Sequence, residues 1–424
     1  MKASISIPHS DIAVIHIESA KLKISDIKVH IIGAGIGGLT TALALAQNGV
    51  EVEVFEKASK FTNVGAGLQL SPNVMTVFSS LDLSKEVEAS CCEPKAGILR
   101  DYKTGKALLT TRMQKDYQAR YGHKYLHIHR ADLIDTIAEA AQKAGIKIHF
   151  GAQVSSIRET ETGTRLENIG KTHQANLLIV ADGIRSFLRE EIAGKSRPVF
   201  TGQVAWRGLV PTSDLPPETI PFAANNWLGP RQHFVSYYVS GGEMINFVAV
   251  QERSEWAEEN WGIPADIGEL KNAFKSWDPR VTSLIDACRN VYLWGLFDHP
   301  PLAKWTTKRM ALLGDAAHPM LPFMAQGAAM AVEDAWVLTH CLINTPSNVS
   351  QALQNYEAFR KSRTTRLQKT SRENAALYHQ ASPLGRVIRK AKFKIATDIP
   401  SIAFSRLDKI YGVDVTQDFP ILPV

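Results

Sequence analysis

The chain has 424 residues, of which 45% are hydrophobic and 21% charged, and its formal net charge at pH 7 is +6. This length exceeds that of a usual compact domain, so we expect two interlocked domains of an ordinary globular protein. The mild positive charge, concentrated late in the chain, suits an anionic cofactor and an acidic small substrate and does not single out nucleic acid. The four cysteines show neither metal-ligand nor disulfide-framework spacing, which favours reduced thiols in a cytoplasmic protein.

Residues 1–26 are predicted to be an N-terminal extension. They show neither an Arg-rich transit pattern nor a signal-peptide core followed by a small-residue cleavage site. No stretch of the sequence reaches the ~18 uncharged apolar residues that a membrane span requires. We therefore expect a cytoplasmic protein without a membrane span.

Residues 28–57 predict a strand, a glycine turn, a helix and a second strand that ends at a carboxylate. Gly33, Gly35 and Gly38 have the G-x-G-x-x-G spacing, which allows a tight turn, a close approach of the backbone to a pyrophosphate and close packing of the helix. Glu56 follows about 20 residues later, where an acid can accept a hydrogen bond from a ribose hydroxyl. Together these features predict a dinucleotide site, and a glycine-rich turn without a ligand is the alternative.

Two more strand-to-helix junctions carry candidate ligand-binding residues. Arg130 follows a predicted strand at 125–129, and Asp182-Gly183 follows another at 175–181, with Arg185 at the expected start of a helix. Ligands of open α/β sheets bind at this edge, beyond the carboxyl ends of the strands. The alternatives are a solvated Arg130 and a plain strand-to-helix connection at Asp182.

Residues 202–299 have a different sequence pattern, in which short runs of β-forming residues alternate with turns rich in Gly, Pro and Asn. They predict a mainly antiparallel sheet with an aromatic-rich face that can bind a flat apolar ligand, joined by a hairpin near 97–111. His233 and Tyr237 are four residues apart on one predicted strand, so they point to the same face and could handle a phenolic proton. A structural pair with satisfied hydrogen bonds is the alternative.

Residues 300–345 are predicted to return to the first domain. A strand at 310–313 runs into Gly314-Asp315, and the Asp315 carboxylate can accept hydrogen bonds from ribityl or ribose hydroxyls. A turn then leads through Gly327 into a helix whose N-terminus can stabilise negative charge on a reduced flavin.

Residues 346–424 are predicted to be helical and basic, with Arg360, Lys361 and Arg363 among the first cations. We interpret these cations as a solvated helix face, with an anionic membrane surface as the alternative.

The combination of motifs resembles the class A flavoprotein aromatic hydroxylases, the family of p-hydroxybenzoate hydroxylase. The resemblance covers roughly residues 28–342 and is carried by the glycine loop with Glu56, HRADL, ADGIRS and LLGDAAHP, in that order. Three longer segments are similar to sequences of one branch of this family, which contains salicylate hydroxylase, 6-hydroxynicotinate 3-monooxygenase and 3-hydroxybenzoate 6-hydroxylase. These segments are VGAGLQLSPN, GQVAWRGLVP and PMLPFMAQGAAMAVEDA.

The resemblance implies an α/β fold with a Rossmann-type FAD-binding domain (27–201 and 300–345), an inserted, mainly antiparallel substrate domain (202–299) and a C-terminal helical region (346–424). It implies tightly bound FAD, NADH or NADPH as a transient reductant, and no metal. The implied cofactor-binding residues are Gly33, Gly35, Gly38, Glu56, Lys57, Gly67, Gln69, Arg130, Asp182, Arg185, Asp315, Pro322, Gly327 and Ala328.

The activity implied by the resemblance is hydroxylation of a small phenolic or hydroxylated heteroaromatic acid, such as salicylate or a hydroxynicotinate, with or without decarboxylation. O2 would be the co-substrate and a flavin C4a-hydroperoxide the oxygen donor, with His233 as the base and Tyr237 as a relay or orienting donor. Pro322 stands where the 3-hydroxybenzoate enzyme has a glutamine, which disfavours that substrate. A hydroxylase or epoxidase of a larger secondary metabolite and a non-catalytic FAD-fold protein stay open, as do a monomer and a homodimer.

Overall fold

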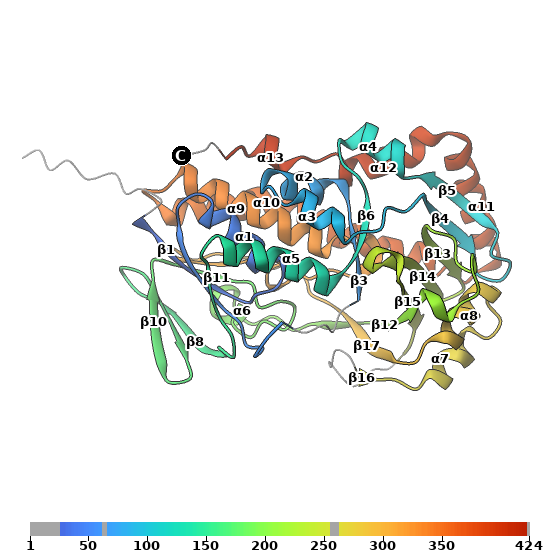
Figure 1. Ribbon diagram of the computed structural model, residues 1–424, viewed down its shortest axis with the longest axis horizontal. Coiled ribbons are helices and arrows are strands. Elements are labelled where there is room, and N and C mark those ends of the chain that lie inside the picture. The colour runs from blue at the N-terminus through green and yellow to red at the C-terminus, as the bar shows by residue number, and fades with distance from the viewer. Residues whose placement is uncertain (1–25, 62–65, 255–262, 422–424) are drawn as a thin grey trace, which may run out of the picture.

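Five parallel strands form the sheet that carries the glycine loop (Figure 1). Their spatial order is β18 (Met310–Leu312), β11 (Leu177–Val180), β1 (Lys28–Ile32), β2 (Glu51–Phe55) and β7 (Lys147–His149). Strands of such sheets are covered on both faces and are therefore almost continuously apolar, and β11 and β18 are buried at every residue. The computed structural model describes residues 26–61, 66–254 and 263–421, so the predicted extension at 1–26, except its last residue, lies outside the described residues.

The two faces of this sheet are covered differently. On one face α1 (Ile36–Ala46) packs between α5 (Arg130–Lys143) and α9 (Gly327–Asn344). On the other lies an antiparallel sheet of β8 (Val154–Glu159), β9 (Thr164–Asn168) and β10 (Lys171–Ala175). The His173 ring of β10 lies 4.9 Å from that of Phe55 on β2. The parallel sheet is therefore a buried central layer.

A second, eight-stranded sheet forms the other end of the molecule. Its order is β16 (Ile263–Pro264), β17 (Val291–Asp298), β12 (Val199–Pro211), β15 (Met244–Glu252), β14 (Gln232–Val239), β13 (Ala224–Gly229), β4 (Ala96–Asp101) and β5 (Ala107–Arg112). Neighbours are antiparallel except β13 and β4, whose parallel pairing adds the β4–β5 hairpin to the sheet. The helices α7 (Ile267–Phe274) and α8 (Pro279–Ala287) share a buried aromatic core with one face, which leaves the other face for a site.

A small sheet of β3 (Gly67–Leu70) and β6 (Leu126–His129) lies between the two large sheets. Its neighbours are the helices α2 (Pro72–Ser80), α3 (Ser84–Ala89) and α4 (Gln114–Tyr121). The short α6 (Arg189–Ala193) follows β11. Within the described ranges, every helix is too short or too polar to cross a membrane.

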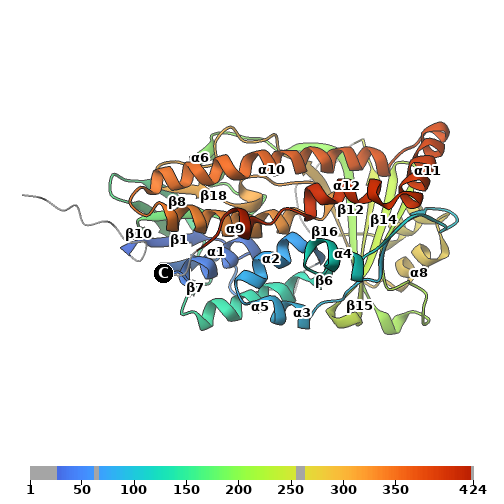
Figure 2. The ribbon, with the colours of Figure 1, turned by 90° about the horizontal axis from the view of Figure 1, so that it is seen from above.

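The C-terminal region consists of α10 (Val349–Tyr378), α11 (Pro383–Asp398), α12 (Pro400–Tyr411) and α13 (Val415–Asp418). Figure 2 shows α10 extending along the long axis of the molecule, from the parallel sheet to the eight-stranded one. The predicted fold class, an α/β Rossmann-type domain with an inserted antiparallel sheet and C-terminal helices, is confirmed. The exact domain boundaries stay a prediction.

Candidate active site

The glycine loop joins β1 to α1 and leaves open space at one of its three glycines. Gly33 has φ +102°, and a Cβ on it would lie 2.4 Å from the Ala181 carbonyl oxygen. A Cβ on Gly38 would lie 2.0 Å from the carbonyl oxygen of Gly33, whereas a Cβ on Gly35 would meet nothing within 4 Å. Gly33 and Gly38 are therefore required by the fold, while Gly35, the N-cap of α1, leaves room for an anionic ligand at the helix N-terminus.

Three carboxylates follow the ends of β2, β11 and β18, and so meet at one edge of the parallel sheet. Glu56 lies against the glycine loop, where it accepts hydrogen bonds from the amides of Ala34 and Ala58, both at 2.8 Å. Asp182 keeps one buried oxygen, Oδ1, that has no hydrogen-bond partner among the described residues. Burial raises the pKa of both Asp182 and Asp315, and in each case the nearby charge of Arg189 opposes that shift.

Arg130 and Arg189 are the cations that approach these acids. Burial lowers the pKa of Arg130, while the charges of Asp315 and Glu56 oppose that shift, so its guanidinium lies within electrostatic reach of both. Arg189 donates from Nε to the Ala316 carbonyl (2.6 Å) and from Nη2 to the Asp315 carbonyl (2.9 Å). It thereby fixes the turn that carries the Asp315 carboxylate.

The predicted role of Arg185 needs a correction of its structural context. The helix after β11 begins at Arg189, not directly after Asp182-Gly183, because residues 184–188 form turns. Arg185 is exposed and Arg189 is buried, so Arg189 is the cation that the sequence pattern missed. Lys57 is also exposed, but its charge still contributes to the electrostatics of Asp182.

The turn at 319–326 is held by polar side chains of α10. Their hydrogen bonds run from Gln368 to the Pro319 carbonyl (2.8 Å), from Ser371 to that of Leu321 (2.7 Å) and from Asn374 to that of Phe323 (3.2 Å). The turn contains Pro322 and leads into Gly327 and Ala328 at the start of α9. A Cβ on Gly327 would lie 3.9 Å from Asp315 Oδ1, so this helix N-terminus adjoins the Asp315 carboxylate.

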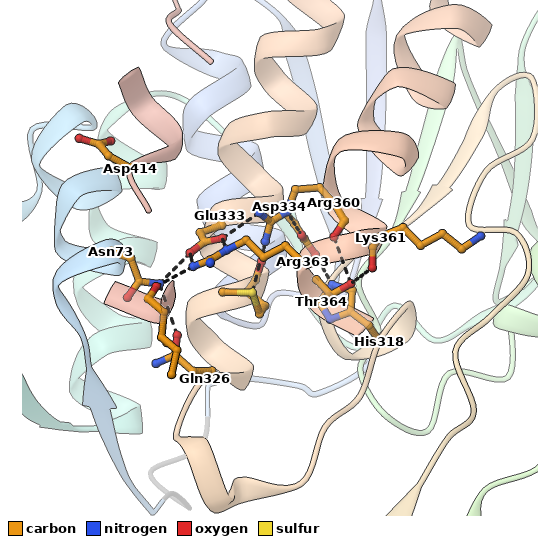
Figure 3. Close-up of polar contacts among 12 residues, drawn as sticks. Asn73, His318, Gln326, Glu333, Asp334, Arg360, Lys361, Arg363, Thr364 and Asp414 are labelled. Atoms are coloured by element: carbon orange, nitrogen blue, oxygen red, sulfur yellow. Dashed lines mark hydrogen bonds and ion pairs between the residues drawn. The ribbon is translucent and has the colours of Figure 1, made fainter. Parts of the chain in front are cut away.

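A buried ion-pair cluster joins α9 to α10 directly behind the site (Figure 3). Glu333 and Asp334 have no exposed surface, and each lies 2.7 Å from the Arg360 guanidinium. Arg363 also pairs with Glu333 at 2.7 Å. The prediction of a solvated basic face is therefore wrong for Arg360 and Arg363, since the helix turns both inward onto acids of α9.

The β3 strand connects the cofactor side to the eight-stranded sheet. The Gly67 amide donates to Asn246 Oδ1 (2.8 Å), and its carbonyl accepts from the Tyr237 hydroxyl (2.7 Å). A Cβ on Gly67 would lie 2.5 Å from the Tyr237 ring, so only glycine fits there. On the same strand, Gln69 accepts a hydrogen bond from the Tyr125 hydroxyl at 2.5 Å.

A cavity of about 410 Å³ lies between the open face of the eight-stranded sheet, the 319–326 turn and the helices α10 to α12. Pro322 and Phe323 line it on the cofactor side, Gln69 at the end of β3, and His233 on β14. Burial lowers the pKa of His233 well below its usual value, so the imidazole is neutral at physiological pH. The cavity thus places a neutral base opposite the turn that precedes α9.

His233 and Tyr237 point to the same face of β14, but they do not form a pair. Four residues along a strand separate them by about 13 Å, and the Tyr237 hydroxyl is bonded to Gly67. The expected relay from His233 through Tyr237 is therefore not formed. The partner of His233 is His379, which follows α10 and lies 2.7 Å away, from Nδ1 to Nε2.

The fold and its strand-end motifs define a flavoprotein whose dinucleotide site lies at one edge of the parallel sheet. Residues 26–371 match the family described as "FAD binding domain", and the chain belongs to this family. The glycine loop, the unpartnered Asp182 oxygen and the N-terminus of α9 fit FAD.

The relatives place the chain among the aromatic hydroxylases. It is 36% identical to 3-amino-4-hydroxybenzoate 2-monooxygenase of Streptomyces platensis over 83% of this chain and 88% of that protein. It is 34% identical to 6-hydroxynicotinate 3-monooxygenase of Bordetella bronchiseptica over 84% and 93%. The structure of a salicylate hydroxylase substrate complex aligns with a TM-score of 0.78 and 28% identity, covering 93% of this chain and 99% of that one. The protein is thus an FAD-dependent monooxygenase, with NAD(P)H as the typical reductant of the family.

Proposed function

We propose that the protein hydroxylates a small phenolic or hydroxylated heteroaromatic acid bound in the cavity beside His233. The observation that carries the proposal is that His233 lies in the wall of the cavity, opposite the 319–326 turn, and that its imidazole is neutral. Salicylate, a hydroxynicotinate and an aminohydroxybenzoate are the substrates that fit the names of the relatives.

Bound FAD, reduced by NAD(P)H, would supply the activated oxygen taken from O2. The protein's own part is to bind the ring, exclude water and remove the phenolic proton, because a phenolate ring is a far better nucleophile than the phenol. His233 accepts that proton on Nε2, since Nδ1 is bonded to His379. A positioned general base of this kind contributes roughly 10²–10⁴-fold to the rate.

The charge of the cavity supports an acidic substrate. Among the described residues that line it, Arg406 of α12 alone carries a permanent charge, and its Nη2 donates to Asn374 Oδ1 at 2.7 Å. A guanidinium can bind a carboxylate with two parallel hydrogen bonds, so Arg406 is suited to the acid group of the ring. The proposal includes a cytoplasmic location and a monomer or homodimer.

The test is NADH and NADPH consumption by the FAD-loaded protein with salicylate, 6-hydroxynicotinate, 3-hydroxybenzoate and 3-amino-4-hydroxybenzoate, with product identification. At least one acid should give a hydroxylated product, and His233→Ala should lower that turnover by two or more orders of magnitude while FAD stays bound. His340→Ala, which removes an imidazole of α9 outside the cavity lining, is the matched control. Consumption that yields only hydrogen peroxide, or full turnover by His233→Ala, would contradict the proposal.

A further inference from the structure

Three titratable side chains form a continuous hydrogen-bonded chain behind the cavity. His233 Nδ1 lies 2.7 Å from His379 Nε2, and His379 Nδ1 lies 3.1 Å from Glu252 Oε1. The two histidines are 2% and 3% exposed, whereas the Glu252 side chain is 39% exposed. The chain therefore leads from a buried base to the protein surface.

The backbone holds the three residues in register. Arg231, in the turn between β13 and β14, donates its amide to the His379 carbonyl at 3.0 Å, and its own carbonyl accepts from the Glu252 amide at 3.0 Å. His379 ends α10 and donates its amide to the Ala375 carbonyl at 3.0 Å. The end of β15, the turn before β14 and the end of α10 are thus bonded to one another through their backbones.

The ionised carboxylate at the surface dictates the proton positions along the chain. A carboxylate only accepts, so His379 must carry its proton on Nδ1 and donate it to Glu252. His379 Nε2 then accepts, which places the proton of His233 on Nδ1 and leaves the lone pair of His233 on Nε2. That nitrogen is the one that can meet a phenol in the cavity, so the chain sets the base-competent tautomer of His233.

The charges around the chain keep both rings neutral. Burial lowers the pKa of His379 to about 4, assisted by the charge of Arg389 from α11. Burial likewise lowers the pKa of His233. Burial raises the pKa of Glu252, and the positive charge of Arg231 opposes that shift. The Tyr378 ring meets the His233 ring edge to face, with centroids 5.4 Å apart, and Arg406 is the charged side chain of the cavity lining.

We propose that His379 and Glu252 form the path along which the substrate's phenolic proton leaves the cavity, a proposal that rests on the hydroxylase function above. The phenolic O–H bond breaks as His233 Nε2 takes the proton, and His233 passes its Nδ1 proton to His379 Nε2. His379 passes its Nδ1 proton to Glu252, which releases it to water. The substrate becomes a phenolate and one proton enters solvent. The imidazoles of His233 and His379 both end neutral, each with its proton on Nε2 instead of Nδ1.

Concerted transfer of this kind removes a specific physical obstacle. A buried imidazolium is costly, and it would face the phenolate from which it took the proton, so His233 alone would readily return that proton. Transfer through a second imidazole exports the charge without leaving a cation next to the substrate. His379 and Glu252 therefore act through His233 and are positioning and proton-transfer residues.

The experiment uses the oxidised, FAD-loaded protein without NAD(P)H, so that no turnover occurs. The phenolic acid of the panel that the wild type hydroxylates fastest is mixed with the enzyme in a stopped-flow instrument. Phenolate formation is followed by its ultraviolet absorbance, and proton release by phenol red. Wild type, His379→Phe, His379→Gln, Glu252→Gln and the exposed control Glu243→Gln are compared, with flavin content and melting temperature as checks on folding.

His379→Phe should slow phenolate formation and proton release about 10²-fold at pH 7, the lower end of a general-base effect. The difference in rate between His379→Phe and the wild type should vanish at pH values above the pKa of the free phenol, because the substrate is then already ionised when it binds. In His379→Gln the amide oxygen can still accept from His233 Nδ1, so the phenol should bind normally while proton release stays slow. Glu252→Gln should slow proton release, and Glu243→Gln should leave both signals unchanged.

The outcomes separate the path from the function. Equal phenolate and proton signals in wild type and both His379 variants would overturn the proton path and leave the hydroxylase proposal intact. Absence of phenolate in the wild type, with an acid that it hydroxylates, would likewise overturn the proton path alone, whereas failure to hydroxylate any acid of the panel would overturn the function and the path with it. If the folding checks show that His379→Phe has lost its flavin, the comparison rests on His379→Gln, which keeps a hydrogen-bonding side chain of similar length.

Discussion

The Asp334 carboxylate and the Gly314 amide are joined by a hydrogen bond of 3.1 Å behind the cofactor site. The same oxygen, Oδ2, lies 2.5 Å from His318 Nε2, and the other, Oδ1, accepts from Arg360 Nε at 2.7 Å. Gly314 begins the turn that carries Asp315, with φ +61°. One buried acid of α9 therefore ties the cofactor-facing turn to α10, as Figure 3 shows for its side-chain partners.

Asp334→Asn should lower the free energy of unfolding by roughly 3–5 kcal/mol, the usual cost of removing one partner from a buried ion pair. FAD should also be retained less well, because the turn at Gly314 loses its anchor. Urea denaturation and flavin content measure the two effects. Asp418→Asn, at an exposed aspartate of α13, is the control, and equal stability of the two variants would contradict the assigned role.

The same residue predicts a specific loss of stability in acid. The charges of His318 and Arg360 outweigh burial and lower the pKa of Asp334 to about 2, from an ordinary 3.8. A lowered pKa gives a stabilisation that is complete above pH ~4 and is lost as the pH falls through the folded value. The free energy of unfolding of the wild type should therefore fall more steeply between pH 4 and pH 2 than that of Asp334→Asn. Parallel curves in that interval would contradict the shift.

The glycine loop allows folding to be separated from cofactor binding. A Cβ on Gly35 meets nothing within 4 Å, so Gly35→Ala should fold with the melting temperature of the wild-type apoprotein. It should bind FAD at least about tenfold more weakly, equivalent to ~1.4 kcal/mol, because the methyl group occupies the approach of the pyrophosphate. Gly33→Ala should instead destabilise the apoprotein by about 1–3 kcal/mol, from its positive φ alone. Apoprotein melting and quenching of flavin fluorescence distinguish the two.

Arg189 should matter more to the folded site than Arg185. Arg189→Gln leaves the carbonyls of Ala316 and Asp315 without their donor, at a cost of about 1–3 kcal/mol in stability. Loss of flavin on dialysis should follow, since the turn around Asp315 is released. Arg185→Gln should retain both the melting temperature and the flavin, and its effect should be confined to the KM for the nicotinamide cofactor. The reverse ranking in flavin retention would contradict the structural assignment.

Arg406→Gln should raise the KM for an acidic substrate by about 10- to 100-fold, as expected for losing a hydrogen bond to a charged group. The kcat should change little, because the guanidinium is not bonded to His233. Steady-state kinetics with the best acid of the panel, and with the matching phenol that lacks the carboxylate, provide the measurement. Lys394→Gln, an exposed cation of α11, should leave both KM values unchanged. An equal rise of KM for the acid and the neutral phenol would exclude Arg406 as the carboxylate partner.

The sequence predicted the cofactor edge of the fold well because its signals are local. Each motif residue, such as Glu56, Asp182 or Asp315, directly follows a short apolar run. Parallel strands of one sheet bring their carboxyl ends to one edge, so these residues meet there whatever lies between them in the chain. The 310–313 strand and the helix after Gly327 were predicted on the same grounds and are present as β18 and α9.

The substrate side was harder because its contacts depend on how distant elements pack. His379 is 146 residues from His233 and belongs to no motif, and only the crossing of α10 behind β14 brings them together. Arg360 and Arg363 looked like surface cations because a helix with many charges does not reveal which of its faces is covered. The polar residues Gln368, Ser371 and Asn374, spaced by three along α10, were the signal of a buried polar face that could have been noticed.

The length of α10 has a consequence for how the enzyme can change. This single helix pairs with Glu333 through Arg360 near its middle and ends at the partner of His233. Adding one residue between Asn374 and His379 would advance the far end by about 1.5 Å and rotate it by about 100°. Such an insertion would leave the cofactor supports paired and turn His379 away from the base. Substitutions on its exposed face are therefore tolerable, whereas a change of a single residue in its length would disconnect the base from the surface.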